Sequence, residues 1–248
     1  MGDFNGLRAV ITGGASGIGA ATARHLLNQG ATVAALDIAP QNAPVGVAGV
    51  RCDVADTESV EAAIAEAVER LGGIDILVNN AGIGAQGDIA ANSEEEWRRV
   101  FEINVLGIMR VTQAALPHLR ISAHPAIVNT SSIAATAGLP ERALYSASKG
   151  AVHALTLAMA ADHLREGIRV NAVAPGTADT PWVGRLLDNA ANPTAERAAL
   201  AARQPHGRLV SADEIAAAVA YLASPVNGST AGVVLHVDGG MDSLRLRP

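Results

Sequence analysis

Residues 7–30 have the sequence LRAVITGGASGIGAATARHLLNQG, and their pattern determines the architecture that we expect for the rest of the chain. Residues 7–12 are a short apolar run that is typical of a buried strand, and residues 18–29 have a helical pattern that Gly30 ends. The glycines between them allow a tight turn, in which the backbone and the start of the helix can approach a phosphate closely. Glycine is common in turns, however, so this segment alone fits an ordinary loop equally well.

The same alternation of strands and helices continues along the whole chain. The further strands that we predict span residues 32–37, 49–53, 74–79, 126–131, 169–174 and 233–237. The further helices span residues 58–71, 93–117, 143–165 and 211–222. This order predicts an α/β fold: one domain over residues 1–248 with a doubly wound parallel sheet and helices on both faces. Ligands of such sheets bind beyond the carboxyl ends of the strands.

The composition excludes several classes of protein. Hydrophobic residues make up 49% of the 248 residues and charged residues 17%, which is too apolar for a disordered chain. The net charge of −6 and the lack of a Lys/Arg stripe argue against a nucleic-acid partner. Cys52 is the only cysteine, which excludes an intramolecular disulfide and a cysteine-based zinc site, and we expect no metal. No apolar run is long enough for a membrane span, and the first residues do not form a secretion signal, so we expect a cytoplasmic protein.

Acidic and amide side chains follow three of the predicted strands. Asp37 ends the second strand, where a carboxylate can bind both ribose hydroxyls of an adenosine and repel a 2′-phosphate. No Arg or Lys stands at positions 15, 16, 38 or 39 to attract that phosphate, so the sequence favours NAD over NADP. Asp53 ends the third strand, where it can bind an adenine amino group, and the motif NNAG at residues 79–82 lets the backbone pass close to a ribose. Each of these features also fits an ordinary turn.

Tyr145 and Lys149 are four residues apart on a predicted helix, so their side chains share one face. Bringing the pKa of a tyrosine from about 10 to about 7 takes about 4 kcal/mol. A cation about 5 Å away supplies about 3 kcal/mol at an effective dielectric constant near 20. Lys149 and an oxidised nicotinamide together can therefore make Tyr145 a general base. A Y-x-x-x-K pair on its own is far more often part of an ordinary helix surface.

The motifs occur together and in a fixed order: TGGASGIG at 12–19, NNAG at 79–82, Asn104, the serines at 131 and 132, YSASK at 145–149 and PG at 175–176. In this combination the chain resembles the short-chain dehydrogenase/reductase family over residues 7–240. The resemblance implies a Rossmann-like fold, NAD as the cofactor, a small-molecule substrate and a homotetramer. The segments PGTADTPW, RQPHGRL and LRLR look most like the sugar and sugar-acid dehydrogenases of that family.

The resemblance implies a catalytic set of four residues. The family's serine lies 13 residues before its tyrosine, which selects Ser132 rather than Ser131. Ser132 would bind the reacting oxygen, Tyr145 would exchange the proton, and Lys149 would bind the nicotinamide ribose and lower the pKa of the tyrosine. Asn104 would hold a water that links Lys149 to solvent; the alternative is a buried side chain that satisfies a local helix irregularity.

The resemblance also places a larger set of residues around the cofactor. These are Gly13, Ser16, Gly17, Ile18, Gly19, Asp37, Asp53, Val54, Asn80, Ala81, Gly82, Tyr145, Lys149, Pro175, Gly176, Ala178 and Thr180.

Residues 180–210 form a helix-rich segment that we expect to act as a lid on the substrate side. Its arginines can bind a carboxylate or hydroxyls, or can pair with Asp188 or Glu196 instead; they are Arg185, Arg197, Arg203 and Arg208. The sequence thus predicts an NAD-dependent oxidoreductase of a secondary alcohol, a sugar or sugar acid. Two alternatives stay open: a 3-oxoacyl-thioester reductase, against which Asp37 speaks, and a non-catalytic NAD-binding sensor or scaffold.

Overall fold

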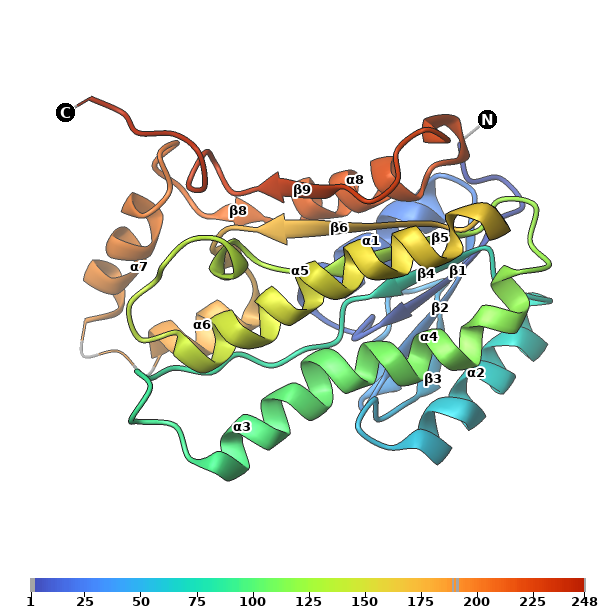
Figure 1. The fold of residues 1–248 in the computed structure, drawn as a ribbon, viewed down its shortest axis with the longest axis horizontal. Helices are drawn as coiled ribbons and strands as arrows, with labels where there is room; N and C mark the ends of the chain where they lie inside the picture. The colour runs from blue at the N-terminus through green and yellow to red at the C-terminus, as the bar shows by residue number, and fades with distance from the viewer. Residues whose placement is uncertain (1–2, 189, 191, 248) are drawn as a thin grey trace.

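Seven parallel strands form one sheet in the computed structural model, which describes residues 3–188, 190 and 192–247. The strand order is β3-β2-β1-β4-β5-β6-β9, so the chain reverses its direction of winding between β1 and β4 (Figure 1). The strands are β1 Arg8–Thr12, β2 Thr32–Asp37, β3 Ala48–Arg51, β4 Ile76–Asn79, β5 Ala126–Thr130, β6 Arg169–Pro175 and β9 Val234–Val237. The predicted α/β fold with a doubly wound parallel sheet is confirmed.

Helices cover both faces of the sheet because neighbouring strand residues point to opposite sides. Val10 of β1 packs toward α2 (Thr57–Leu71), α4 (Gly107–Leu119) and α5 (Ala143–His163), together with Leu77 of β4. Ile11, the next residue of β1, packs toward α1 (Gly17–Asn28) and α8 (Ala212–Ala223). In Figure 1, α4 and α5 cross in front of the sheet. No helix of the described chain is both long and apolar enough to cross a bilayer.

The helix predicted over residues 93–117 differs from the expectation. It consists of α3 (Glu94–Phe101), a wide π-helical turn at Glu102–Leu106, and α4. It also continues past Pro117, which lies in the last turn of α4. The helix ends at Leu119, and Arg120 N donates to Leu116 O as its C-cap. The wide turn has no signature in the apolar spacing, but it holds one of the predicted site residues, Asn104.

Residues 178–211 form a small unit of their own beside the main sheet. The two-residue strands β7 (Ala178–Asp179) and β8 (Val210–Ser211) pair with each other, and α6 (Pro181–Asp188) and α7 (Pro193–Ala202) lie between them in the chain. Four apolar side chains form its core: Val183, Leu187, Leu200 and Leu209. The short strands were not predicted, because two residues carry no alternation pattern.

Buried amides connect the central strands to α5. Asn79 Nδ2 donates to Asn129 Oδ1 (2.9 Å), and these two residues are direct register partners on β4 and β5. Asn129 Nδ2 donates in turn to Thr156 Oγ1 (3.0 Å) on α5. This chain of hydrogen bonds lies immediately before the carboxyl ends of both strands.

Arg169, at the start of β6, caps the C-terminal end of α8. It is buried, and its guanidinium donates to Leu222 O (2.7 Å), Ala223 O (2.9 Å) and Ser224 O (3.1 Å). Burial lowers its pKa, but the positive charge lies at the negative end of the helix dipole.

We expect Arg169→Met to lower the free energy of unfolding by about 2–4 kcal/mol, because several buried carbonyl groups lose their donors. Urea denaturation measures this change. The exposed Arg165→Met is the control and should change stability by less than about 0.5 kcal/mol. A loss as small for Arg169 as for Arg165 would contradict the capping role.

Candidate active site

A cavity of about 420 Å³ lies beyond the carboxyl ends of β1, β4, β5 and β6. Its size is within the range of small-ligand sites. The predicted site residues that line it are Gly13, Ser16, Gly17, Ile18, Asn80, Ala81, Gly82, Ser132, Tyr145, Lys149, Pro175, Gly176, Ala178 and Thr180. The predicted residues outside its lining are Gly19, Asp37, Asp53, Val54 and Asn104.

The glycine-rich turn forms one end of the cavity. Gly13 and Gly17 have φ angles of +63° and +50°, and a Cβ at Gly14 would come within 2.7 Å of Ala35 Cβ. A Cβ at Gly19 would collide with Gly13 O. The side chain of Ser16, the N-cap residue of α1, does not cap the helix, and the first turn holds no acid. The free N–H groups of α1 and its dipole therefore fit a phosphate group at this end.

Thr12 connects the glycine-rich turn to the NNAG motif. Its Oγ1 accepts hydrogen bonds from Asn80 N and Ala81 N, both at 3.0 Å. Asn80 Nδ2 donates back to Thr12 O (3.0 Å) and Gly13 O (3.2 Å). Sequence reasoning placed Thr12 in the motif without a role; its position as the last residue of β1, facing the end of β4, was the available signal.

The acids after β2 and β3 have different environments. Asp37 accepts hydrogen bonds from Ala15 N (3.1 Å) and Ala39 N (3.0 Å), so its carboxylate is attached to the glycine-rich turn. Asp53 is exposed and accepts from Ala55 N (2.9 Å), which is the contact of a turn residue. Val54 is buried against Gly107 of α4.

Ser132, Tyr145 and Lys149 lie together on one wall. Ser132 follows β5, accepts a hydrogen bond from Ala134 N (3.1 Å) and is hydrogen-bonded to the Tyr145 hydroxyl. Lys149 Nζ donates to Thr130 O (2.7 Å) and lies 5.9 Å from the centre of the Tyr145 ring. The helical spacing of Tyr145 and Lys149 thus places both at the end of β5.

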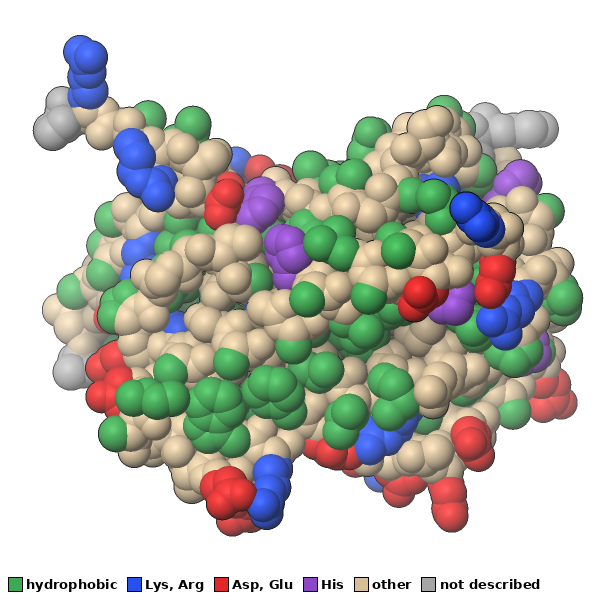
Figure 2. Space-filling model, in the orientation of Figure 1, with side chains coloured by type: hydrophobic (Ala, Val, Ile, Leu, Met, Phe, Trp, Pro, Cys, Tyr) green, Lys and Arg blue, Asp and Glu red, His purple; other side chains and the backbone are tan. Residues whose placement is uncertain are grey.

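Apolar packing holds Tyr145 in this place. Figure 2 shows hydrophobic side chains gathered between α3 and the start of α5. There Trp97 and Phe101 stack with ring centres 6.1 Å apart, and they pack with Leu144 and Tyr145.

The electrostatics differ in one respect from the expectation. Burial raises the pKa of Tyr145 above 10, while the hydrogen bond from Ser132 and the positive charge of Arg142 oppose that increase. Burial also lowers the pKa of Lys149 to about 8. Among the protein groups, Arg142 is therefore the cation whose charge acts on the phenol, and the sequence reasoning did not name it. Arg142 is the N-cap residue of α5, three residues before Tyr145, and this nearness in the sequence was the available signal.

Asn104 lies in the π-helical turn and is completely buried. Its Oδ1 accepts from Ile83 N (2.8 Å), and its Nδ2 donates to Ile83 O (3.0 Å) and Ser148 Oγ (3.1 Å). These contacts satisfy a buried side chain, as the alternative expected, but they reach Ile83 and Ser148 rather than the backbone of the wide turn. They also attach the loop after β4 to α5, next to Lys149; the water relay stays a prediction.

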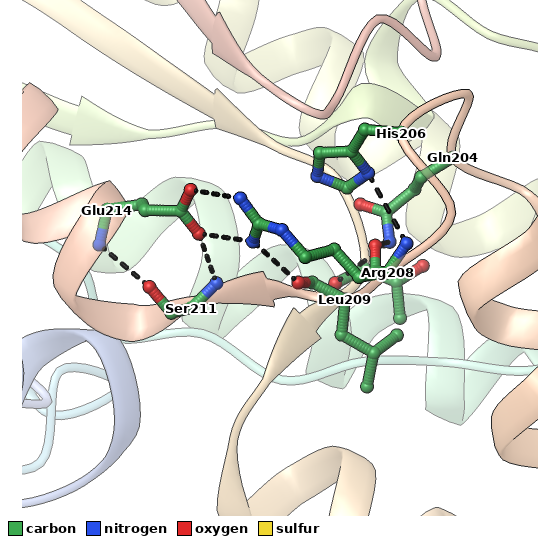
Figure 3. A network of polar contacts seen from close by, with 7 residues as sticks. Gln204, His206, Arg208, Leu209, Ser211 and Glu214 are labelled. Atoms are coloured by element: carbon green, nitrogen blue, oxygen red, sulfur yellow. Dashed lines mark hydrogen bonds and ion pairs between the residues drawn. The ribbon is translucent and has the colours of Figure 1, made fainter.

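The arginines of residues 180–210 do not act as one group. Arg197 pairs with Asp179 (2.6 Å). Arg208 pairs with Glu214 (2.7 and 2.8 Å), and Figure 3 shows this second pair. The expected partners Asp188 and Glu196 are therefore wrong for both. Arg203 lines the cavity, and the side chain of Arg185 lies outside the described part of the chain.

The sheet topology and the Ser–Tyr–Lys cluster at its carboxyl edge are those of a Rossmann-like oxidoreductase. Residues 13–242 match the family model described as Enoyl-(Acyl carrier protein) reductase. The cis-4-hydroxycyclohexanecarboxylate dehydrogenase of Sinomonas cyclohexanicum is 44% identical over 247 residues, which cover 94% of this chain and 95% of that protein. The chain belongs to the short-chain dehydrogenase/reductase family and is an enzyme of that family.

Solved structures agree with this assignment. The aldohexose dehydrogenase of Thermoplasma acidophilum superimposes with a TM-score of 0.91 at 31% identity, covering 99% of this chain and 98% of that one. The 3-ketoacyl-(acyl-carrier-protein) reductase of Brucella melitensis, complexed with NADH, has a TM-score of 0.87 at 32% identity, covering 96% and 99%.

We expect Lys149→Met to stabilise the free protein at pH 7 by about 1–3 kcal/mol, because it removes a buried charge while losing one hydrogen bond to Thr130 O. Since the pKa of Lys149 falls from 10.5 to about 8 on folding, the cost of its burial is fully present below pH 8 and disappears toward pH 10.5. The stability advantage of the variant should shrink over that interval, as measured by urea denaturation at several pH values. The exposed Arg99→Met serves as control; a gain independent of pH would contradict this explanation.

Proposed function

We propose that this enzyme is an NAD-dependent dehydrogenase that oxidises the secondary hydroxyl of a small molecule, with sugars and sugar acids as the substrate class that the sequence favours. The observation that carries the proposal is the meeting of Ser132, Tyr145 and Lys149 at a cavity whose other end is the uncapped start of α1. The names of the relatives support it, because a ring-alcohol dehydrogenase and an aldohexose dehydrogenase are among them.

The residues have complementary roles in this reaction. Ser132 Oγ and Tyr145 Oη bind the carbinol oxygen, and ionised Tyr145 accepts its proton as general base. Lys149 binds the nicotinamide ribose, and Asn104 holds the loop after β4 beside it. NAD, when bound, supplies the acceptor for the hydride that leaves the carbinol carbon.

The remaining residues hold the cofactor. Gly13, Ser16, Gly17, Ile18 and Gly19 form the pyrophosphate cradle at the start of α1. Asp37 binds the adenosine ribose, and Asp53 and Val54 flank the adenine. The nicotinamide end is bounded by Asn80, Ala81, Gly82, Pro175, Gly176, Ala178 and Thr180. Residues 180–210 act as the substrate-side lid of a single domain, and by the family resemblance the enzyme works as a cytoplasmic homotetramer.

A second candidate is a 3-oxoacyl-thioester reductase, in which Tyr145 would donate a proton to a ketone. The likeness to the Brucella melitensis reductase favours it. Turnover of acetoacetyl-coenzyme A with a reduced cofactor, compared with turnover of secondary alcohols with NAD, separates the two candidates.

Tyr145→Phe should lower kcat by at least about 1000-fold, because the proton acceptor is lost while the ring still packs against the buried cluster of Ala85, Val100 and Leu144. We would measure NADH formation with a panel of secondary alcohols, sugars and sugar acids. NADH binding, followed by its fluorescence, should change less than about threefold, because the aromatic ring is retained. A variant with wild-type turnover would refute the role of the phenol, and a variant that cannot bind NADH would point to a structural one.

Asp37→Asn should raise the ratio of kcat/KM with NADP to kcat/KM with NAD by at least about tenfold, because it removes a negative charge that faces the 2′-phosphate. The asparagine keeps an acceptor oxygen for Ala15 N or Ala39 N. Asp53→Asn, which removes an acid next to the adenine, should change that ratio by less than about twofold because its charge is exposed and more distant. Equal effects of the two substitutions would show that Asp37 does not select the cofactor.

A further inference from the structure

The cavity is strongly cationic at its substrate end. Its charged lining residues are Arg142, Lys149 and Arg203, and none of the lining residues that the structure describes is an Asp or a Glu. Lys149 is bound to Thr130 O and faces the cofactor side in the proposed function. Two guanidinium groups therefore remain for the substrate.

Arg142 is held firmly in place. Its Nη1 donates to Ala85 O (3.1 Å), which uses one of its five N–H groups. The backbone beside it is attached to Gly87, because Gly87 N donates to Glu141 O (3.0 Å) and Ala143 N donates to Gly87 O (3.4 Å). Glu141 has a φ angle of +55°, the single positive value of a non-glycine residue among the described residues. The Glu141 carboxylate accepts from Gln86 Nε2 (3.3 Å) and does not pair with Arg142.

The side chain of Arg203, the C-cap residue of α7, has no hydrogen bond or ion pair to any described residue. The neighbouring Arg197 and Arg208 both have carboxylate partners, so the lack of one at Arg203 distinguishes it. Burial, and after it the charge of Arg203, lower the pKa of Arg142, while the charges of Tyr145, Glu141 and Glu196 oppose that decrease. Arg142 therefore lies within electrostatic reach of Arg203. Two unpaired cations on one cavity repel each other unless an anion binds between them.

Apolar side chains also line the cavity. Those that line it are Ile83, Ile133, Leu139, Trp182, Val183 and Leu200. Sugar hydroxyls against these side chains would lose hydrogen bonds to water without replacement, whereas a hydrocarbon skeleton would not.

We propose that Arg142 and Arg203 bind the carboxylate of the substrate, and that this substrate is a hydroxy acid with a hydrocarbon skeleton. Its secondary hydroxyl reaches Ser132 and Tyr145, and its carboxylate lies between the two guanidinium groups, which are suited to bidentate binding. The proposal rests on the proposed dehydrogenase function, and it replaces the sugars and sugar acids that the sequence favours with a hydrocarbon hydroxy acid as the substrate class.

The first test compares an acid with its neutral amide. The substrates are 4-hydroxycyclohexanecarboxylate and 4-hydroxycyclohexanecarboxamide with NAD, each as the cis and the trans isomer. Wild type should prefer the acid in kcat/KM, and either Arg203→Met or Arg142→Gln should reduce that acid-to-amide ratio by about 10–100-fold. Glutamine at 142 keeps a donor for Ala85 O, and methionine at 203 breaks no hydrogen bond that the described structure contains. Arg197→Met, whose arginine is paired with Asp179, should leave the ratio unchanged.

The second test does not depend on turnover. Calorimetry with NAD-saturated enzyme measures the binding of cyclohexanecarboxylate and cyclohexanecarboxamide, which carry no hydroxyl to oxidise. The arginine site is supported if the wild type binds the acid more tightly than the amide and Arg203→Met abolishes this preference. This result would hold even if no alcohol is oxidised and the proposed function fails. The arginine site is overturned if the wild type binds or uses the acid no better than the amide, or binds neither. It is also overturned if the wild type uses a neutral aldose better than the acid. Oxidation of alcohols in that case leaves the dehydrogenase function intact.

Discussion

The hydrogen-bond chain from Asn79 through Asn129 to Thr156 is the interaction on which the site depends. A buried amide in the middle of a sheet is costly without a partner, so it fixes the register of β4 against β5 and of both against α5. A slip of one residue would break both bonds. Asn80 follows Asn79, Thr130 follows Asn129, and Lys149 lies two helical turns before Thr156 on α5. The register of the sheet therefore sets the distances between the loop after β4 and the wall formed by Ser132, Tyr145 and Lys149.

Helix starts away from the site differ from the start of α1, which lies at the site. The helices α2, α3, α7 and α8 begin with a side chain that accepts from the first turn, and α8 has the full capping box of Ser211 and Glu214. At α1 the Ser16 side chain leaves those N–H groups free. Lys149 and Arg142 likewise hold charges that burial disfavours, because burial lowers the pKa of both groups. Such local cost is what a site prepared for a charged cofactor and an anionic substrate requires.

The fold and half of the site chemistry could be predicted because they depend on local pattern. Residues 32–37 are the strand that the structure has as β2, and Gly30 and the glycine at 167 end their helices as expected. Contacts that depend on tertiary placement could not be predicted. The roles of Thr12 and Arg142 arise where separate loops meet, and the partners of Arg197 and Arg208 come from β7 and α8 rather than from their own segment.

Arg142 links substrate binding to proton transfer, because the same guanidinium faces the cavity and acts on the phenol of Tyr145. A carboxylate bound to Arg142 compensates its charge and so weakens the help that it gives to the ionised phenol. In the proposed function, the positive charge of an oxidised nicotinamide would then supply the difference. The reduced cofactor lacks that charge, which favours the protonated phenol needed to reduce a ketone. In the proposed reaction, the charge of the bound cofactor would therefore favour one direction of proton transfer at Tyr145, and Arg142 would adjust that balance according to the substrate.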